Sequence, residues 1–340
     1  METELTDLVK ELERQRESSK DLIVDSRSLQ VIPDGNQGIR MAIPEYGDYS
    51  LTEWAHSQIA EKLQIPKRYY DRMRNANKTE LLAENVNAWL GEKERRLVRI
   101  TDRRIRAILS DRYRIMDNYD LVFLTLYEFR KKETIQVYRA DLTERMLYLK
   151  AVDMTLTAEI REQDIIYGGL IIRNSEIGAS AFKVEPFLLR KICDNGLIGE
   201  LALKRIHLGK QTAEIGEIDW SDETKELEDK ALWAKARDII TATFDRDVFE
   251  SWIDKLKQST EIVIEHPVKA VNNVVKLAGL TEEHKSELLM HFSEHTKYGL
   301  VNAVTSLARD TESVDARIRL EEFGGRLLSA PEHEFEEIIA

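Results

Sequence analysis

The stretch RRLVRITDRRIRAILSDRYR, residues 95–114, contains eight arginines and two aspartates in a chain whose formal net charge is −12. Apolar and polar residues alternate on both sides of TDRR, a pattern typical of two strands joined by a turn. The return strand is expected to place two sets of side chains on opposite faces: Ile105, Ala107 and Leu109 on one, and Arg104, Arg106 and Ile108 on the other. We therefore predict a β-hairpin with guanidinium groups along one face.

The segments on both sides of this hairpin predict the rest of the fold. Strand-like pieces precede it at 21–32 and 38–43, four β-rich segments follow it, and helical periodicity dominates from about residue 222 onward. We predict an α+β fold: a mainly antiparallel sheet with flanking helices, followed by an all-helical C-terminal region. The expected divisions are an N-terminal helix at 1–20, an α+β core domain with the basic hairpin at 21–210, and an acidic helical domain at 211–340.

The composition is that of a globular chain with a sizeable core, because 42% of its 340 residues are hydrophobic and 33% are charged. No apolar run approaches the roughly 18 residues that a membrane helix needs. The single cysteine, Cys193, fits a reducing compartment. We expect a cytoplasmic protein without a membrane partner.

Charge is distributed unevenly along the chain. Residues 62–114 hold 15 basic and 7 acidic residues, a net charge of +8, whereas residues 211–340 hold 15 basic and 28 acidic residues, a net charge of −13. Binding of a polyanion depends on the local field and not on the total charge. The basic middle region is therefore compatible with a nucleic-acid partner.

The arginine-rich hairpin is the first candidate site. Arginine forms permanently charged, bidentate contacts with phosphates, and enrichment in arginine without lysine is unusual for simple solubilisation. We predict phosphate contacts from Arg99, Arg103, Arg104, Arg106, Arg112 and Arg114, and stacking of Tyr113 on unpaired bases. The alternative is a solvated sheet face whose arginines pair with Asp102, Asp111 and the acidic C-terminal helices.

The stretch SQIAEKLQIPKRYYDRM, residues 57–73, resembles a helix-turn-helix. Ala60 lets two helices approach, and Tyr70 is expected to pack between them, but Gln64 occupies a turn position where glycine is favoured. The second helix would add the candidate nucleic-acid contacts Lys67, Arg68 and Arg72. We favour the simpler interpretation, an αα-hairpin packed on the sheet.

A search for catalytic or metal-binding residues gives no strong candidate. His284, Glu287, His291 and His295 share one helical face, but their row is too long for one ion, so we interpret it as a helix surface. The sequence lacks GxSxG, GxxxxGK[ST], GxGxxG and CxxC. We expect no catalytic residue, no metal and no cofactor. Cys193 is interpreted as a small buried residue.

Three stretches resemble motifs of a phage- and plasmid-encoded family labelled domain of unknown function 932: RAILSDRYRIMDNYDL (106–121), IIRNSEIGASAFKVEPFLLRKICDNGLIG (171–199) and HTKYGLVNAVTSLARD (295–310). The resemblance spans about residues 20–310 and implies no particular activity. It implies motif positions of unassigned role at Arg106, Ser110, Asp111, Arg112, Tyr113, Asn174, Ser175, Gly178, Arg190, Cys193, Asn195 and Gly196. Several of these residue types also set turns, and we expect an Asn-Gly turn at Asn195 and Gly196.

These features predict a nucleic-acid-binding protein of phage or plasmid replication or recombination that is not an enzyme. By analogy with single-strand annealing proteins, we expect a preference for single-stranded DNA and a homo-oligomer. Two alternatives stay open. One is a metal-dependent enzyme acting on nucleic acid, and the other is a structural or host-interaction module whose arginines pair with the acidic helices.

Overall fold

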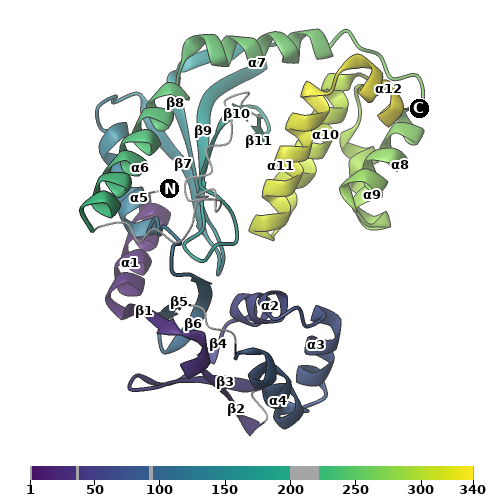
Figure 1. The fold of residues 1–340 in the computed structure, drawn as a ribbon. Coiled ribbons are helices and arrows are strands. Elements are labelled where there is room, and N and C mark those ends of the chain that lie inside the picture. Colours follow the sequence, from purple (N-terminus) through teal and green to yellow (C-terminus); the bar gives the residue numbers. More distant parts are fainter. Residues whose placement is uncertain (1, 36–37, 92–94, 200–221, 340) are drawn as a thin grey trace.

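The computed structural model describes residues 2–35, 38–91, 95–199 and 222–339, and these residues form two β-sheets with helices around them (Figure 1). The antiparallel-rich sheets and the all-helical C-terminal region confirm the predicted α+β class. The predicted boundary at residue 210 lies outside the described residues. The β-rich part of the chain, predicted as one sheet, divides into two sheets with separate hydrophobic clusters.

The first sheet has six strands in the order β1-β5-β6-β4-β3-β2. Their bounds are β1 Ser19–Asp25, β2 Gln30–Pro33, β3 Ile39–Ile43, β4 Gly47–Leu51, β5 Arg95–Thr101 and β6 Arg104–Ser110. All pairs are antiparallel except β4 with β6. Helices α2 Glu53–Lys62 and α4 Thr79–Trp89 pack against it, and α3 Lys67–Asn75 packs against these two helices. Their apolar side chains and those of the sheet form one cluster that includes Ile59, Tyr70 and Val98.

The second sheet has five antiparallel strands in the order β11-β10-β9-β8-β7. Their bounds are β7 Ile135–Leu142, β8 Leu147–Glu159, β9 Ile165–Asn174, β10 Lys183–Arg190 and β11 Asn195–Ile198. Alternate residues of β8 face different clusters, because Leu147 and Leu149 join the largest cluster whereas Tyr148 joins a smaller one beneath α11. Both faces of this sheet are therefore packed.

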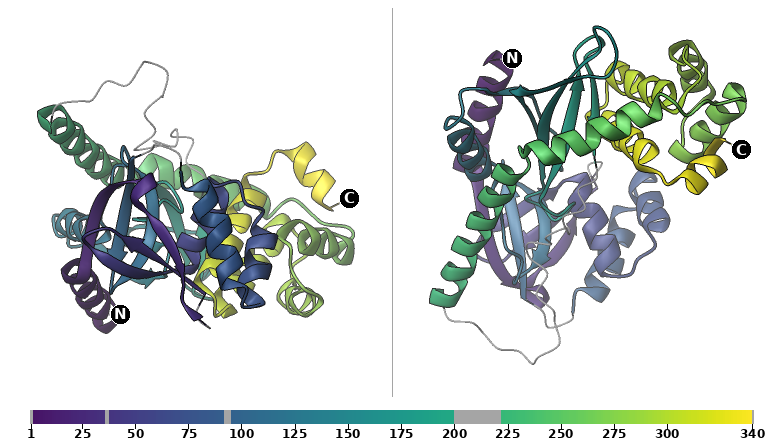
Figure 2. Two further views of the ribbon diagram at one scale, coloured as in Figure 1. Left: turned by 60° about the horizontal axis from the view of Figure 1, so that its bottom comes forward. Right: turned by 90° about the horizontal axis from the view of Figure 1, so that it is seen from above.

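The remaining helices have the bounds α1 Glu2–Ser18, α5 Asn118–Phe129, α6 Asp222–Ala242, α7 Arg246–Ser259, α8 Pro267–Ala278, α9 Glu282–His291, α10 Lys297–Asp310, α11 Val314–Ser329 and α12 Glu332–Ile339. Of these helices, α10 and α11 contact β11 of the second sheet, and α8, α9 and α12 lie beyond them (Figure 1). Figure 2 shows α6 and α7 running in succession along the outside of the molecule toward the C-terminal helices. Trp252 and Leu256 of α7 belong to the cluster that also holds the apolar residues of α10 and α11, so one core joins this sheet to the C-terminal helices.

The structure differs from the sequence prediction in which β6 side chains share a face of the sheet. The β5–β6 turn has positive φ at Asp102 (52°) and Arg103 (59°), which suits a two-residue hairpin turn. A β-bulge follows, because Ile100 pairs with Ile105 but Arg99 pairs with Ala107. The extra residue changes the alternation of side chains. Ile105 and Ile108 therefore join the cluster under the helices, whereas Ala107 and Leu109 join a separate small cluster.

The expected turn at Asn195 and Gly196 is also wrong. Both residues are buried in β11, where Asn195 pairs with Arg190 and Gly196 pairs with Leu189. The reversal lies just before them, and Asp194 takes the positive φ of 56°. Gly196 is needed for close approach, because a Cβ there would lie 2.6 Å from both a carboxylate oxygen of Glu321 and the ring of Phe187.

The pairing of β9 with β8 makes the protein sensitive to substitution at Gly169, which lies opposite Val152. A Cβ at Gly169 would overlap the carbonyl oxygen of Ala151 and approach Cα of Val152 to 2.8 Å, and backbone atoms cannot move aside cheaply. We expect Gly169→Ala to lower the free energy of unfolding by about 2 kcal/mol or more, measured by urea denaturation. Gly91→Ala is the matched control, because a Cβ at Gly91 meets nothing within 4 Å. Equal stability of the two variants would contradict this packing.

Candidate nucleic-acid interface

The loop after β9, residues 174–178, joins the two sheets. Glu176 is 8% exposed, and its carboxylate accepts hydrogen bonds from Nη1 of Arg106 (3.0 Å) and from the backbone N–H of Asn118 (2.7 Å). Its carbonyl oxygen accepts a third bond from Nη1 of Arg99 (3.2 Å). Glu176 therefore connects the hairpin of the first sheet with the start of α5.

Arg99 lies inside this junction and not on a phosphate-binding face. Its side chain is buried, and its guanidinium donates to Asp21 (3.0 Å) and Asp117 (2.7 Å) as well as to Glu176. Burial lowers the pKa of Arg99, but the charges of these three acidic residues outweigh burial and raise it above its usual value. The prediction that Arg99 holds a phosphate is wrong, because Arg99 is only 6% exposed and its guanidinium donates to three acceptors within the protein.

Two further arginines of the hairpin region are also engaged within the protein. Arg106 donates to Glu176 and to the carbonyl oxygen of Glu144 (3.3 Å). Arg114 pairs with Glu228 (3.0 Å) and Asp229 (3.6 Å) of the acidic helix α6, which is the arrangement that the alternative interpretation predicted. These arginines do not form one positive face with Arg99, because Arg99 and Arg106 both meet Glu176 at the junction, whereas Arg114 meets the carboxylates of α6.

Tyr113 is not an open stacking surface. Its hydroxyl donates to the carbonyl oxygen of Ser175 (3.2 Å), and its ring packs on the cluster of Leu97, Ala107, Leu109 and Ile177. Burial raises the pKa of Tyr113. Contrary to the prediction, this ring is not free to stack on a base, because it packs against these apolar side chains.

The predicted motif residues 174–178 support the same junction. The Asn174 side chain donates to the carbonyl of Met116 (2.7 Å) and to the side chain of Asn118 (2.9 Å). The Ser175 hydroxyl accepts from the N–H groups of residues 177 and 179. Gly178 has φ of 74°, and a Cβ there would contact the side chain of Leu109. All three roles are structural.

The second group of predicted motif residues joins β10 and β11 to α10. Arg190 donates two hydrogen bonds to Asp164 (2.6 and 2.8 Å), which also accepts from the hydroxyl of Tyr298. Cys193 is half-buried, 3.7 Å from Nη1 of Arg190. The Asn195 side chain donates to the hydroxyl of Ser306 (2.9 Å). These residues hold the sheet against a helix.

Five of the predicted cationic contacts remain available on the surface. Within the part of the chain that the structure describes, no ion pair or side-chain hydrogen bond engages the exposed guanidinium groups of Arg68, Arg72, Arg103, Arg104 and Arg112. Arg103 and Arg104 lie at the tip of the hairpin, whereas Arg112 follows β6 at its other end, next to Ser110 and Asp111. Lys67 is exposed and pairs with Asp71.

Helix α3 carries two of these five arginines, Arg68 and Arg72. The turn before α3 has positive φ at Gln64 (54°), and Tyr70 is fully buried and hydrogen-bonded to Nδ1 of His56 (2.7 Å), so α3 is held firmly against α2. Arg68, Tyr69 and Arg72 lie on the opposite, exposed side, three and four residues apart. The αα-hairpin expected from residues 57–73 is thus present, with its basic residues in solvent.

Sequence reasoning missed three buried charged residues that shape the molecule, Glu176, Lys150 and Glu321. Glu176 lies within a motif that we singled out, but its acidic side chain alone gave no sign of burial. Lys150 and Glu321 form an ion pair (2.6 Å) between β8 and α11 and are 2% and 3% exposed. Burial lowers the pKa of Lys150. Alternation of polar and apolar residues predicts solvent for such side chains, so no local signal could have placed them.

No group of three or more His, Cys, Asp or Glu side chains among the described residues is arranged to hold a metal ion. None of the helices in the described ranges combines the length and the hydropathy that crossing a membrane requires.

Comparison with known proteins gives no match: no protein-family model matches the chain, and no curated protein or solved structure does so. The resemblance to the family labelled domain of unknown function 932 therefore stays a prediction.

The junction predicts a large effect of the Glu176 carboxylate on stability. We expect Glu176→Gln to lower the free energy of unfolding by about 3 kcal/mol, because it leaves Arg106 without its charged partner in a mostly buried site. Urea denaturation measures the change. Glu144→Gln is the control, since Arg106 contacts only the backbone carbonyl of Glu144 and the variant should stay within about 0.5 kcal/mol of the parent. Comparable losses in both variants would contradict the role of the carboxylate.

The buried hydrogen bond between His56 of α2 and Tyr70 of α3 predicts that the free energy of unfolding depends on pH. Burial, reinforced by the charge of Arg74, lowers the pKa of His56 from 6.5 to about 3. A depressed histidine pKa favours the folded state above pH 6.5, and this contribution falls by up to about 1.4 kcal/mol per pH unit between pH 6.5 and 3. We expect His56→Gln to flatten this part of the curve of unfolding free energy against pH. An unchanged slope in that variant would contradict the assignment.

Proposed function

We propose that this protein binds nucleic acid and that the exposed side of α3 is its main contact surface. The observation that carries the proposal is the contrast between two sets of arginines. Arg99, Arg106 and Arg114 are neutralised by carboxylates, whereas Arg68 and Arg72 of α3 have no such partner in the described residues. Unpaired guanidinium groups on a rigid helix favour phosphate contacts, because no existing ion pair must be broken to form them.

A preference for single strands is supported by Tyr69. Its side chain is 45% exposed and lies beside Arg68 and Arg72 on the same helix. An aromatic ring next to cationic groups can stack on an unpaired base while the arginines contact the backbone. The sequence analysis assigned this stacking to Tyr113, whose ring is partly buried against the cluster of Leu97, Ala107, Leu109 and Ile177.

A second candidate function is favoured by the contact between Arg114 and α6. Its ion pairs with Glu228 and Asp229 show that part of the basic region and part of the acidic region neutralise one another. A structural or host-interaction module without nucleic acid would use its charges in this way. This candidate predicts no binding of oligonucleotides even at low salt.

The proposal is tested by fluorescence anisotropy with labelled single-stranded and duplex oligonucleotides at several salt concentrations. We expect tighter binding of single strands, and a logarithm of the binding constant that falls linearly with the logarithm of salt concentration. Arg68→Gln/Arg72→Gln should reduce that slope by about 1.4, because each phosphate contact on a single strand contributes about 0.7. Tyr69→Ala should weaken binding roughly tenfold while it leaves the slope unchanged.

The matched control replaces two exposed arginines outside this surface. Arg237→Gln/Arg319→Gln changes the net charge by the same amount on α6 and α11, so its slope should equal that of the parent protein. An equal loss of slope in both double variants would mean that total charge, and not the α3 surface, drives binding. Absence of binding at low salt would overturn the proposal in favour of the second candidate.

A further inference from the structure

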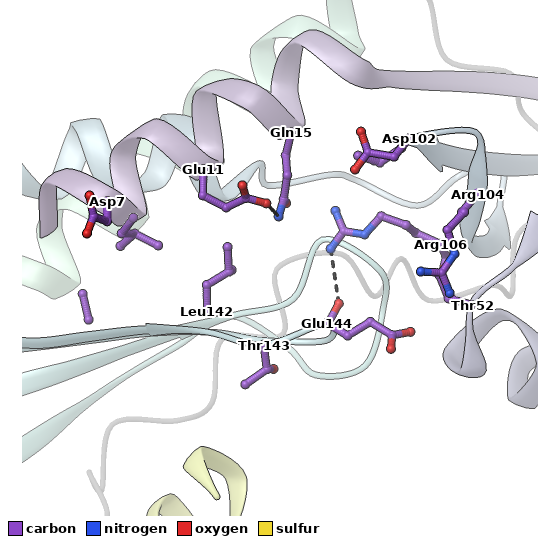
Figure 3. Close-up of a pocket in the computed structure, with 13 residues that line it drawn as sticks. Asp7, Glu11, Gln15, Thr52, Asp102, Arg104, Arg106, Leu142, Thr143 and Glu144 are labelled. Carbon is purple, nitrogen blue, oxygen red and sulfur yellow. Dashed lines mark hydrogen bonds between the residues drawn. The ribbon is translucent and has the colours of Figure 1, made fainter. Parts of the chain in front are cut away.

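A cavity of about 500 Å³ lies between α1, the tip of the β5–β6 hairpin and the turn from β7 to β8 (Figure 3). Its size is within the range of about 300–1,000 Å³ that small-molecule sites occupy. Its walls come from segments far apart in the sequence, and none of the α3 residues lines it. The cavity is therefore a separate feature from the proposed nucleic-acid surface.

One wall of the cavity carries two arginines (Figure 3). Arg106 is fixed by its hydrogen bonds to Glu176 (3.0 Å) and to the carbonyl oxygen of Glu144 (3.3 Å). Arg104 has no ion pair or side-chain hydrogen bond with any described residue. A fixed guanidinium beside a free one is suited to a phosphate, which accepts several charge-assisted hydrogen bonds at once.

Some carboxylates around the cavity are paired with an arginine, and others are not. Arg14 lies just outside and donates to Glu11 (2.8 Å) and to Asp102 (2.8 and 2.9 Å), so it neutralises both. The hydrogen bond from Arg14 lowers the pKa of Glu11 to about 2. Asp7 makes only a long contact with Lys10 (4.0 Å), and the carboxylate of Glu144 has no partner in the described residues. These two remain free to accept hydrogen bonds from a ligand.

This distribution of charge restricts the ligand. A polyphosphate would be repelled by the carboxylates, and inorganic phosphate would use neither those carboxylates nor the apolar lining from Leu8 and Leu142. A ligand with a single phosphate, an apolar ring and N–H donors would satisfy all three parts of the lining. Carboxylates accept hydrogen bonds from the amino groups of bases, as they do in nucleic-acid recognition.

We propose that the cavity binds a nucleoside monophosphate, either free or as the terminal nucleotide of a strand. The phosphate pairs with Arg104 and accepts only from the N–H groups of Arg106 that Glu176 and the carbonyl of Glu144 leave unused. The ring lies against Leu142, and the base donates to Glu144 or Asp7. Binding at this cavity does not depend on the α3 surface, because no residue of α3 lines the cavity. Arg68→Gln/Arg72→Gln should therefore leave it unchanged.

Isothermal titration calorimetry of the full chain tests this site. The probes are AMP, GMP, CMP and UMP, their nucleosides, inorganic phosphate, and dinucleotides with a 5′-phosphate. We expect at least one monophosphate to bind at least tenfold more tightly than its nucleoside and than inorganic phosphate. Binding of that monophosphate alone identifies a free nucleotide as the ligand, and equal binding of its dinucleotide identifies the end of a strand.

Two neighbouring arginines provide the decisive comparison. Arg104→Gln should weaken binding tenfold or more, because it removes the unpaired guanidinium from the cavity. Arg103→Gln, one residue away on the turn and outside the cavity lining, should change the dissociation constant less than twofold. Both side chains are exposed, so thermal melting should show both variants to be folded. The proposal is overturned if no monophosphate binds, if inorganic phosphate binds equally well, or if the two variants behave alike.

Discussion

The buried carboxylate of Glu176 is the interaction on which the joining of the two sheets depends. Each sheet has its own large hydrophobic cluster, and the small cluster of Leu97, Ala107, Leu109 and Ile177 brings apolar residues of both halves together. The two halves therefore meet through a small apolar contact and through polar groups. A buried carboxylate is stable only where donors surround it, and here these are Arg106 and the N–H of Asn118. Because these donors come from different halves, only one relative placement satisfies them. The ion pair thus helps to fix how the two halves meet, and removal of either partner leaves the other buried without its countercharge.

The same constraint explains why an acidic protein concentrates arginine in one stretch. A guanidinium has five donors in a rigid plane, so one side chain can bridge acceptors from several segments. Arg99 does so with Asp21, Asp117 and Glu176, and a lysine with its single nitrogen would not reach all three in this geometry. Much of the local positive charge is therefore structural. It is balanced by carboxylates that lie far away in the sequence.

Sequence patterns were sufficient where the determining contacts are local. The periodicity of residues 222–328 predicted the C-terminal helices, and the turn signal at TDRR predicted the hairpin. They failed where the partner is distant: Arg99 meets Asp21 and Glu176 across 78 and 77 residues, and no alternation of polarity reveals that pairing. The predicted faces of the β6 side chains were wrong for a related reason. The bulge beside Arg106 inserts one residue, which changes the face of every later side chain on the strand.

The arginines that remain free after this pairing lie in two different electrostatic settings. On α3, Arg68 and Arg72 project into solvent, where their interactions are long-ranged, weak individually and screened by salt. At the hairpin tip, Arg104 borders a cavity that also contains carboxylates, where a ligand must match charges of both signs over a few ångströms. The first setting favours extended polyanions with little discrimination. The second favours a small ligand with a defined shape, because only such a molecule can reach the cation and avoid the repulsion.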